Sequence, residues 1–426
     1  MSTQKLSLSN AVLINLNIML GTGIFINTVE LSKRAGLLGG FTYLLVGLLI
    51  LPLIIAIMKL VQIHPSGGFF VFGKTISPLV GYISTWTYFT AKLASATLMI
   101  HVAVALITQI FPFLLTFGSV FIFDLSILTL FISLNLLNMK TGGQIQLGFL
   151  SLKLLPLFFV ILIGLIFFSP AQAITLPIIW EGIPSSLPLA LFAIMGFEAI
   201  CSISNKIENA SHNAPKAIII SCTILLTLVF LFQFFFYTTM GAVLTNQSSF
   251  LGAFPALLTK VFGNNVLFNN KLQALFHLAI ASSALGGCYG ILYSNAWNLY
   301  ILANNKIILG SKLFTRVNSY GIPYVCLFTQ GVICIVYLIT TGGNQVILQQ
   351  LAAFGTSIAF TISVIALLCS KKSENENRLL PALALLSCLI LLSACIKNFI
   401  VVSILPLIGF ILLLIIGLLF YNKKNA

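Results

Sequence analysis

Long apolar runs without a charged side chain dominate the chain. Three of them contain no Asp, Glu, Lys or Arg: Ala217–Thr259 has 43 residues, Leu272–Asn305 has 34 and Val317–Ser370 has 54. A membrane-spanning helix needs about 20 predominantly apolar residues, so each run is long enough to cross a bilayer. The pattern predicts an all-α integral membrane protein with many spans, whose main physical partner is the lipid bilayer.

Polar residues and Gly or Pro clusters divide this pattern into about twelve predicted transmembrane helices. They lie at 11–31, 38–60, 79–110, 117–138, 145–168, 185–203, 216–241, 270–302, 322–340, 346–369, 379–396 and 399–421. The connectors between them are too short for a separate soluble domain of ordinary size.

The composition agrees with this fold class and excludes others. Apolar residues make up 59% of the chain and charged residues 7%, against about 25% charged residues in an ordinary soluble domain. The mean hydropathy is +1.11. The net charge of +14 comes from bases that stand singly or in pairs beside apolar runs. That arrangement is typical of membrane topology rather than of nucleic-acid binding, so no nucleic-acid partner is expected.

The residues that usually carry metal or covalent chemistry are scattered. The eight cysteines form no CxxC pair, and His101 and His277 have no second ligand at helical spacing. We therefore expect free thiols, no metal site and no cofactor. Phosphate-loop, HExxH and Ser-His-Asp patterns are also missing from the sequence, so it does not indicate an enzyme. A channel or a sensor is disfavoured because neither a repeated filter segment nor a signalling domain is visible.

The distribution of Lys and Arg predicts the orientation in the membrane, because cytoplasmic loops carry the excess of positive charge. With the amino terminus inside, 14 bases fall on the cytoplasmic side and 5 on the other, and Lys92 and Lys153 fall inside spans. Both termini are therefore predicted in the cytoplasm. No small-residue cleavage site follows Lys5 and the first apolar run, so the first span is expected to be retained. Many Lys and few Arg favour a bacterial inner membrane.

Two of the predicted spans are interrupted near their middle. The first contains Gly21-Thr22-Gly23, and each glycine weakens a helix by about 1 kcal/mol relative to alanine. The sixth contains Met195-Gly196-Phe197-Glu198, and Glu198 is an ionisable group at membrane depth that needs a partner or a wet cavity. Paired interruptions at corresponding places of two halves indicate a transporter binding site. Freed backbone N–H groups suit a carboxylate and freed carbonyls suit an ammonium, so a zwitterionic amino acid fits.

These residues resemble the amino acid–polyamine–organocation superfamily of permeases. The resemblance runs through about ten spans and rests on several short segments in the right order. They are Asn17–Phe25, His64-Pro65-Ser66-Gly67-Gly68 with Gly81-Tyr82, the segment around Lys153, Gly196-Phe197-Glu198, and Arg316-Val317-Asn318 with Gly321-Ile322-Pro323. The sequence departs from the family pattern after Glu198, where Asn205-Lys206 replaces acidic residues and Ala210 replaces a proline. These departures put gating contacts in doubt more than the substrate class.

The resemblance implies a LeuT-like fold with two inverted five-helix repeats. The first repeat is expected at 11–168 and the second at 185–369, followed by two additional helices at 379–421, with cytoplasmic termini at 1–10 and 422–426. The resemblance also implies alternating access around a site between the interrupted spans and spans three and eight.

Site residues follow from the resemblance by matching motifs. Thr22 and Gly23 are expected to bind the substrate carboxylate, and carbonyls near Met19, Phe192, Ala193 and Met195 to bind its amine. Phe192 matches an aromatic gate and Tyr88 a substrate-facing tyrosine. The full expected substrate set is Met19, Gly21, Thr22, Gly23, Ile24, Tyr88, Phe192, Ala193, Met195 and Gly196.

Three ionisable residues at membrane depth are candidates for coupling or selectivity. Lys153 lies about eight residues inside the fifth span, roughly 12 Å at 1.5 Å per residue, which is long for snorkelling. It resembles a lysine that replaces sodium in some permeases. Glu198 has either a structural or a proton-sensing role. Lys92 stands one turn after Tyr88 and is expected either to face the substrate path or to pair with Glu198 or Asp124.

The function expected from these observations is secondary active transport of amino acids. We expect it to be proton-coupled and sodium-independent, with an arginine/agmatine-like exchanger as the alternative. The side-chain specificity and the oligomeric state stay open, because ordinary apolar residues line such pockets. Asp124 and Glu181 are expected at the outer membrane interface.

Overall fold

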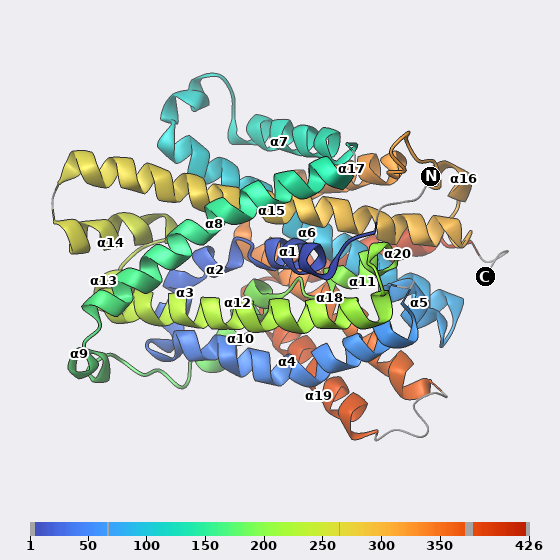
Figure 1. The fold of residues 1–426 in the computed structure, drawn as a ribbon, viewed down its shortest axis with the longest axis horizontal. Coiled ribbons are helices and arrows are strands. Elements are labelled where there is room, and N and C mark those ends of the chain that lie inside the picture. Colours follow the sequence, from blue (N-terminus) through green and yellow to red (C-terminus); the bar gives the residue numbers. More distant parts are fainter. Residues whose placement is uncertain (1–4, 66–67, 138, 264, 371–377, 423–426) are drawn as a thin grey trace.

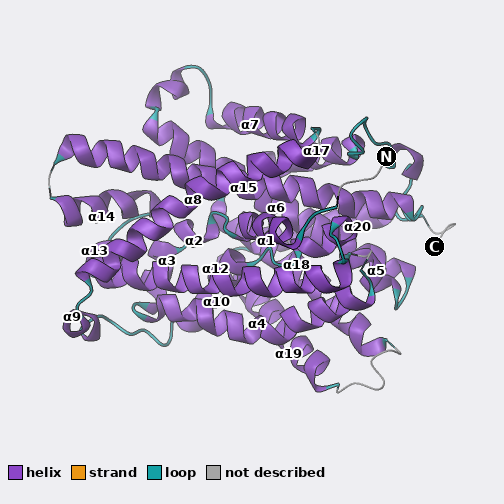
Figure 2. Ribbon diagram, viewed as in Figure 1, coloured by secondary structure: helices purple, strands orange, loops and turns teal. Residues whose placement is uncertain are grey.

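The computed structural model describes residues 5–65, 68–137, 139–263, 265–370 and 378–422. Within these ranges the chain is built from helices, and the only β-type pairing is three isolated bridges. Figure 2 shows helices in every part of the molecule. Ser66, Gly67, Lys371, Lys372, Lys423 and Lys424, which entered the motif and charge predictions, lie outside the described residues.

All twelve predicted spans are found as helices. They are α1 (Leu8–Met19) with α2 (Gly23–Ile26), α4 (Leu38–Ile63), α6 (Pro78–Ile110), α7 (Val120–Asn135), α8 (Met139–Phe167), α10 (Ile183–Ile194) with α11 (Ala199–Ile203), α12 (Ala210–Met240), α15 (Val266–Asn304), α17 (Tyr324–Thr341), α18 (Gln345–Cys369), α19 (Leu379–Val402) and α20 (Leu405–Leu419). Within the described chain, ten spans are long and apolar enough to cross a membrane. Helices α7 and α20 are shorter, with 16 and 15 residues.

Short helices cover the ends of these spans. They are α3 (Thr28–Ala35), α5 (Phe69–Lys74), α9 (Pro170–Ile174), α13 (Ala242–Thr245), α14 (Ala253–Phe262), α16 (Ser311–Phe314) and the 3-10 turns η1 (Pro112–Thr116), η2 (Ser204–Lys206) and η3 (Phe250–Gly252). The predicted first span 11–31 therefore ends early, because α3 is a separate helix after the turn at Asn27.

The boundary between the last two helices also differs from the prediction. The polar pair at 397–398 was expected to separate them, but α19 continues to Val402. A charged side chain does not interrupt backbone hydrogen bonding, whereas Ser403 is extended and Pro406 stands in the first turn of α20. Proline is favoured at the start of a helix, so the backbone breaks there.

Helix α6 occupies the centre of the bundle and packs against α15, α17 and α18. It begins at a strong start signal, because Ser77 accepts a hydrogen bond from the Val80 N–H and Pro78 follows the cap. The long helices run side by side along the long axis of the molecule, and α12 packs on α4 (Figure 1). This places both interrupted helices, α1–α2 and α10–α11, in the interior of the bundle.

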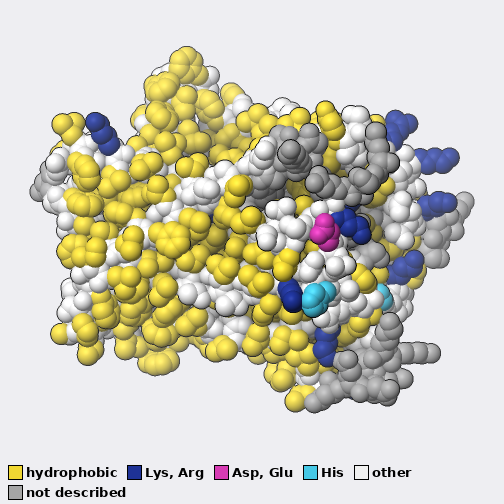
Figure 3. All heavy atoms as spheres, in the orientation of Figure 1, with side chains coloured by type: hydrophobic (Ala, Val, Ile, Leu, Met, Phe, Trp, Pro, Cys, Tyr) yellow, Lys and Arg dark blue, Asp and Glu magenta, His cyan; other side chains and the backbone are white. Residues whose placement is uncertain are grey.

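The surface matches a bilayer environment. Large apolar side chains on α4, α8, α17 and α20 are exposed, including Leu48, Ile166 and Leu405. On the face in Figure 3, apolar side chains cover most of the surface, and Lys and Arg gather mainly at the end where α5 and α16 lie. The chain is therefore a multi-pass membrane protein.

Backbone contacts join segments that the charge pattern assigns to one side. Leu6 forms a bridge with Ile207 after α11, and Tyr421 forms one with Ile308 after α15. At the other end of the bundle, Gly36 after α3 pairs with Ile178 before α10. The arrangement is compatible with the prediction that both ends of the chain lie in the cytoplasm.

We expect a green fluorescent protein fused to the carboxyl terminus to fluoresce in bacterial cells, because the positive-inside rule places that end in the cytoplasm. Alkaline phosphatase inserted at Gln247, in the opposite loops, should be active. The reverse pattern, with an inactive insertion at Gln247 and active phosphatase at the carboxyl terminus, would refute the orientation.

Candidate functional site

Helix α1 ends at Met19 and α2 begins at Gly23, so the first span is broken where the double glycine stands. A Cβ on Gly23 would lie 2.7 Å from Cα of Ala193, and one on Gly21 would lie 2.6 Å from Cε of Met99. Both distances are shorter than van der Waals contact. The glycines therefore allow the broken segment to approach α10 and α6 closely.

The sixth span is broken between Ile194 and Ala199. Met195 is extended, and Gly196 has φ +122°, a backbone region that favours glycine. A Cβ on Gly196 would lie 3.2 Å from Cα of Met19. The two breaks therefore face each other, with Gly23 against Ala193 and Gly196 against Met19.

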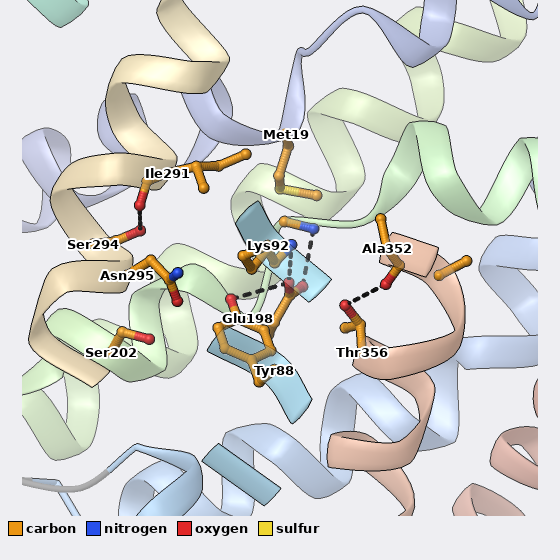
Figure 4. A network of polar contacts seen from close by, with 12 residues as sticks. Met19, Tyr88, Lys92, Glu198, Ser202, Ile291, Ser294, Asn295, Ala352 and Thr356 are labelled. Atoms are coloured by element: carbon orange, nitrogen blue, oxygen red, sulfur yellow. Dashed lines mark hydrogen bonds and ion pairs between the residues drawn. The ribbon is translucent and has the colours of Figure 1, made fainter. Parts of the chain in front are cut away.

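A buried ion pair holds the second break. Figure 4 shows Tyr88 and Lys92, one turn apart on α6, both pointing toward Glu198. The Lys92 Nζ lies 2.5 Å from Glu198 Oε1, and the Tyr88 hydroxyl donates to the same oxygen at 3.2 Å. The other carboxylate oxygen accepts a bond from the Gly196 N–H at 2.9 Å. The expected pairing of Lys92 with Glu198 is thus confirmed.

Lys153 holds the first break. Its ammonium is fully buried and donates to the carbonyl oxygens of Asn17 at 2.8 Å and Leu20 at 2.7 Å. The Ser283 hydroxyl on α15 donates to the Leu20 and Gly21 carbonyls. Among the described residues the Lys153 ammonium forms no ion pair with a carboxylate. Carbonyls freed at the carboxyl end of α1 are thus satisfied by one cation and one hydroxyl.

A small cavity of about 20 Å³ lies between the breaks. The predicted residues that line it are Met19, Gly21, Gly23, Phe192, Ala193, Met195 and Gly196. Thr22, Ile24 and Tyr88 are buried close by without lining it, and the Thr22 hydroxyl has no partner within the described part of the chain. The cavity holds about one water molecule, so the structure is closed around the site.

Sequence reasoning missed part of the cavity wall. Ser95, Met99 and Ile291 also line it, whereas Lys92, which lines it too, was one of the residues expected to face the substrate path. Tyr88, Lys92, Ser95 and Met99 follow helical spacing, so they lie on one face of α6. The helical spacing, continued from Tyr88 along the sequence, could have predicted Ser95 and Met99. Ile291 on α15 carried no such signal.

At the end of the bundle where Leu6 and Tyr421 form their bridges, polar contacts connect the second break to α15. The Ser202 hydroxyl donates to Asn298 Oδ1 at 3.0 Å, and Asn298 in turn donates to Asn295 Oδ1. Nζ of Lys206 lies 4.6 Å from the centroid of the Trp297 ring. These contacts join α11 and η2 to α15 at that end of the molecule.

Asp124, expected at the outer membrane interface, lies near the start of α7 with its side chain buried against α6. Its side chain is 1% exposed, and Oδ2 lies 2.8 Å from His101 Nδ1. Residue position along a helix indicates depth in the membrane but does not predict the packing of a neighbouring helix. His101 on α6 supplies the polar partner that α7 lacks.

Two interrupted helices that pack around a closed cavity, within a bundle of spanning helices, define the architecture of a membrane transporter. The chain belongs to the amino acid permease family, whose model matches residues 6–426. This confirms the resemblance to the amino acid–polyamine–organocation superfamily and the all-α membrane fold.

The names of individual relatives mention different substrates. The chain is 24% identical to an aspartate-proton symporter of Bacillus subtilis, over 76% of this chain and 65% of the relative. It is 21% identical to a lysine-specific permease of Lactococcus lactis, over 76% and 66%. It is 22% identical to a D-serine/D-alanine/glycine transporter of Escherichia coli, over 75% and 70%. The chain thus spans about two thirds of the length of these relatives.

We expect Gly23→Leu to abolish amino acid binding in the closed cavity between the breaks, because the added side chain would clash with Ala193 and Phe192 in the cavity wall. Binding of a labelled amino acid to the purified variant measures this. Gly148→Leu is a matched control, since a Cβ at Gly148 meets no described atom within 4 Å. Undiminished binding by the Gly23 variant would overturn the assignment of the cavity.

Proposed function

We propose that the chain is a secondary active transporter that moves amino acids across the membrane by alternating access, coupled to protons and independent of sodium. The observation that supports it most is the Lys153 ammonium, which binds the freed carbonyls of Asn17 and Leu20. Membership of the amino acid permease family supports the amino acid as the small-molecule substrate.

The broken helices supply complementary groups for the two charges of an amino acid. Backbone N–H groups of Thr22, Gly23 and Ile24 at the start of α2 suit the carboxylate, because the first N–H groups of a helical segment lack intrahelical partners. Carbonyls of Phe192, Ala193 and Met195 at the end of α10 suit the ammonium. The two breaks are in close contact at Met19 and Gly196. Substrate binding therefore requires the two breaks to move apart.

The position of the Lys153 ammonium supports sodium independence. Backbone carbonyls at membrane depth attract a cation, and here a covalently attached ammonium already binds two of them. A sodium ion in the same place would meet a like charge in a low-dielectric interior. Lys153 therefore takes the role that a bound cation would have between α1 and α8.

Two ionisable side chains at the breaks, Lys153 and Glu198, support proton coupling. A neutral Lys153 would lose its charge-assisted bonds to α1, and a protonated Glu198 would lose its ion pair with Lys92. Either change loosens one break and leaves the other intact. The gain or loss of one proton can therefore bias the two states of the transporter.

Uptake of labelled amino acids into proteoliposomes, with and without an inward proton gradient, tests this function. The proposal requires uptake of at least one amino acid that rises with the gradient. Uptake that needs a preloaded amino acid and ignores the gradient would establish the exchanger alternative. No uptake or exchange of any amino acid would reject the proposed function.

Sodium replacement gives a separate check. At fixed pH and membrane potential, we expect equal initial uptake rates in sodium and in choline buffer, because Lys153 supplies the positive charge. The measurement is initial uptake by the wild-type protein across a range of sodium concentrations. A saturable rise of the rate with sodium would contradict the proposal.

The charged residues near the cavity also indicate which net charge the substrate carries. Glu198 does not line the cavity and is already paired with Lys92, and no described carboxylate lines the cavity. A second substrate ammonium would enter a low-dielectric space without a free counter-charge, at a cost of several kcal/mol. The rings of Tyr88, Phe192 and Phe197 compensate only part of this cost, since cation–π attraction contributes about 0.5–2 kcal/mol. Phe192 is the one of the three that lines the cavity, whereas Phe197 stacks on Phe360 and Tyr88 on Phe69.

We therefore expect neutral amino acids to bind more tightly than dicationic ones. Competition by leucine, alanine, arginine, lysine and agmatine against a bound labelled substrate measures the order. Displacement by arginine or agmatine at lower concentration than by every neutral amino acid would refute the charge argument.

A further inference from the structure

A second and larger cavity, of about 330 Å³, lies on the side of the bundle opposite to the two chain ends. Its walls come from the α2–α3 turn, the first half of α10, the segment around η3 and the start of α18. We call it the outer cavity. It is large enough for a free amino acid, since small-molecule sites begin near about 300 Å³.

The outer cavity lies in series with the closed cavity between the breaks. Ile26 lines the outer cavity three residues after Gly23, and Leu189 lines it three residues before Phe192. Three residues of helix advance about 4.5 Å. Gly23 and Phe192, whose ring would lie 3.0 Å from a Cβ on Gly23, therefore stand between the two cavities.

One polar group in the outer cavity has no partner among the described residues. Gln350 on α18 lines the cavity and is 5% exposed, and neither atom of its side-chain amide makes a hydrogen bond there. Its neighbours are held: Gln349 donates to Asn27 Oδ1 at 3.3 Å, and Asn27 donates to the Leu189 carbonyl at 2.8 Å. A buried amide without partners is unfavourable, so the Gln350 side chain is placed to bind something that enters the cavity.

The charges around Gln350 indicate what that ligand is. Helix α18 begins at the cavity with Gln345 and Val346, and the amino end of a 25-residue helix favours an anionic group. Arg34 also lines the cavity and lies 3.6 Å from Glu30, a lining carboxylate. The cavity thus offers positive and negative groups together with a donor-acceptor amide.

We propose that the outer cavity is a second binding site for a zwitterionic amino acid, which Gln350 and the start of α18 hold by its carboxylate and Glu30 by its ammonium. This inference rests on the proposed function, because it places the substrate one helical turn before the Phe192 gate. Recognition uses only the α-carboxylate and α-ammonium, so the site accepts many amino acids before the inner cavity selects among them.

Labelled glycine is the probe, because it carries both charges and no side chain. We expect purified Gly23→Leu in lipid nanodiscs to bind one glycine per chain in the outer cavity. Adding Gln350→Leu should weaken that binding about tenfold or more, as for a lost hydrogen bond to a charged group. Gln172→Leu, on an exposed residue of α9, is the matched control and should leave binding unchanged. Acetate or methylamine alone should displace glycine poorly.

Thermal unfolding separates a binding role of Gln350 from a structural one. Because the amide lacks partners in the described chain, Gln350→Leu should keep or raise the unfolding temperature while glycine binding falls. If the Gly23 variant does not fold, wild-type protein should bind two glycines per chain and the Gln350→Leu variant one. Glycine affinity that Gln350→Leu leaves unchanged in either background would overturn the proposal, as would a folded Gly23→Leu that binds no glycine.

The two proposals fail in different ways. Amino acid uptake by the wild type without glycine binding by the folded Gly23 variant removes only the outer site. Glycine binding that depends on Gln350, without any amino acid uptake or exchange in proteoliposomes, removes the transport function and leaves a binding site.

Discussion

Every feature of the site depends on one constraint: a polypeptide that unwinds inside a bilayer must find partners for its freed backbone groups, because no water is there to supply them. Three side chains meet this requirement. Lys153 and Ser283 bind the carbonyls at the end of α1, and Glu198 binds the Gly196 N–H in the second break. Without such partners, continuous helices would be the more stable form.

Charge balance follows from the same constraint. A carboxylate at the second break is costly unless a cation pairs with it, and Lys92 supplies that cation from α6. A buried pair of this kind adds little net stability, whereas loss of one partner leaves an uncompensated charge. The pair thus connects the second break to α6, the central helix of the bundle. The charges of Lys92 and Glu198 cancel, so the pair adds no net charge at that break. Lys153 pairs with no carboxylate of the described chain, and its partners are the freed carbonyls of the first break.

The sequence predicted the helices well because their signals are local. Length and apolar composition identify a span, and Gly21, Gly23 and Gly196 mark the breaks. The partners of those breaks could not be chosen in the same way, because Lys92 and Glu198 are far apart in the chain and Asp124 was an equal candidate. The outer cavity was not predicted at all, since its walls combine short segments of α3, α10 and α18 that share no sequence pattern.

We infer that the Lys153 ammonium keeps the first break in its unwound form. Methionine at this position keeps most of the length and removes the charge, leaving the Asn17 and Leu20 carbonyls without their donor, a loss of about 1.5–3 kcal/mol for each charge-assisted bond. The direct measurement compares the unfolding temperature and amino acid affinity of Lys153→Met with those of Lys312→Met, a matched change at an exposed lysine. A lower unfolding temperature and lost binding are expected for Lys153→Met alone. Wild-type values for both properties in Lys153→Met would contradict this role of the ammonium.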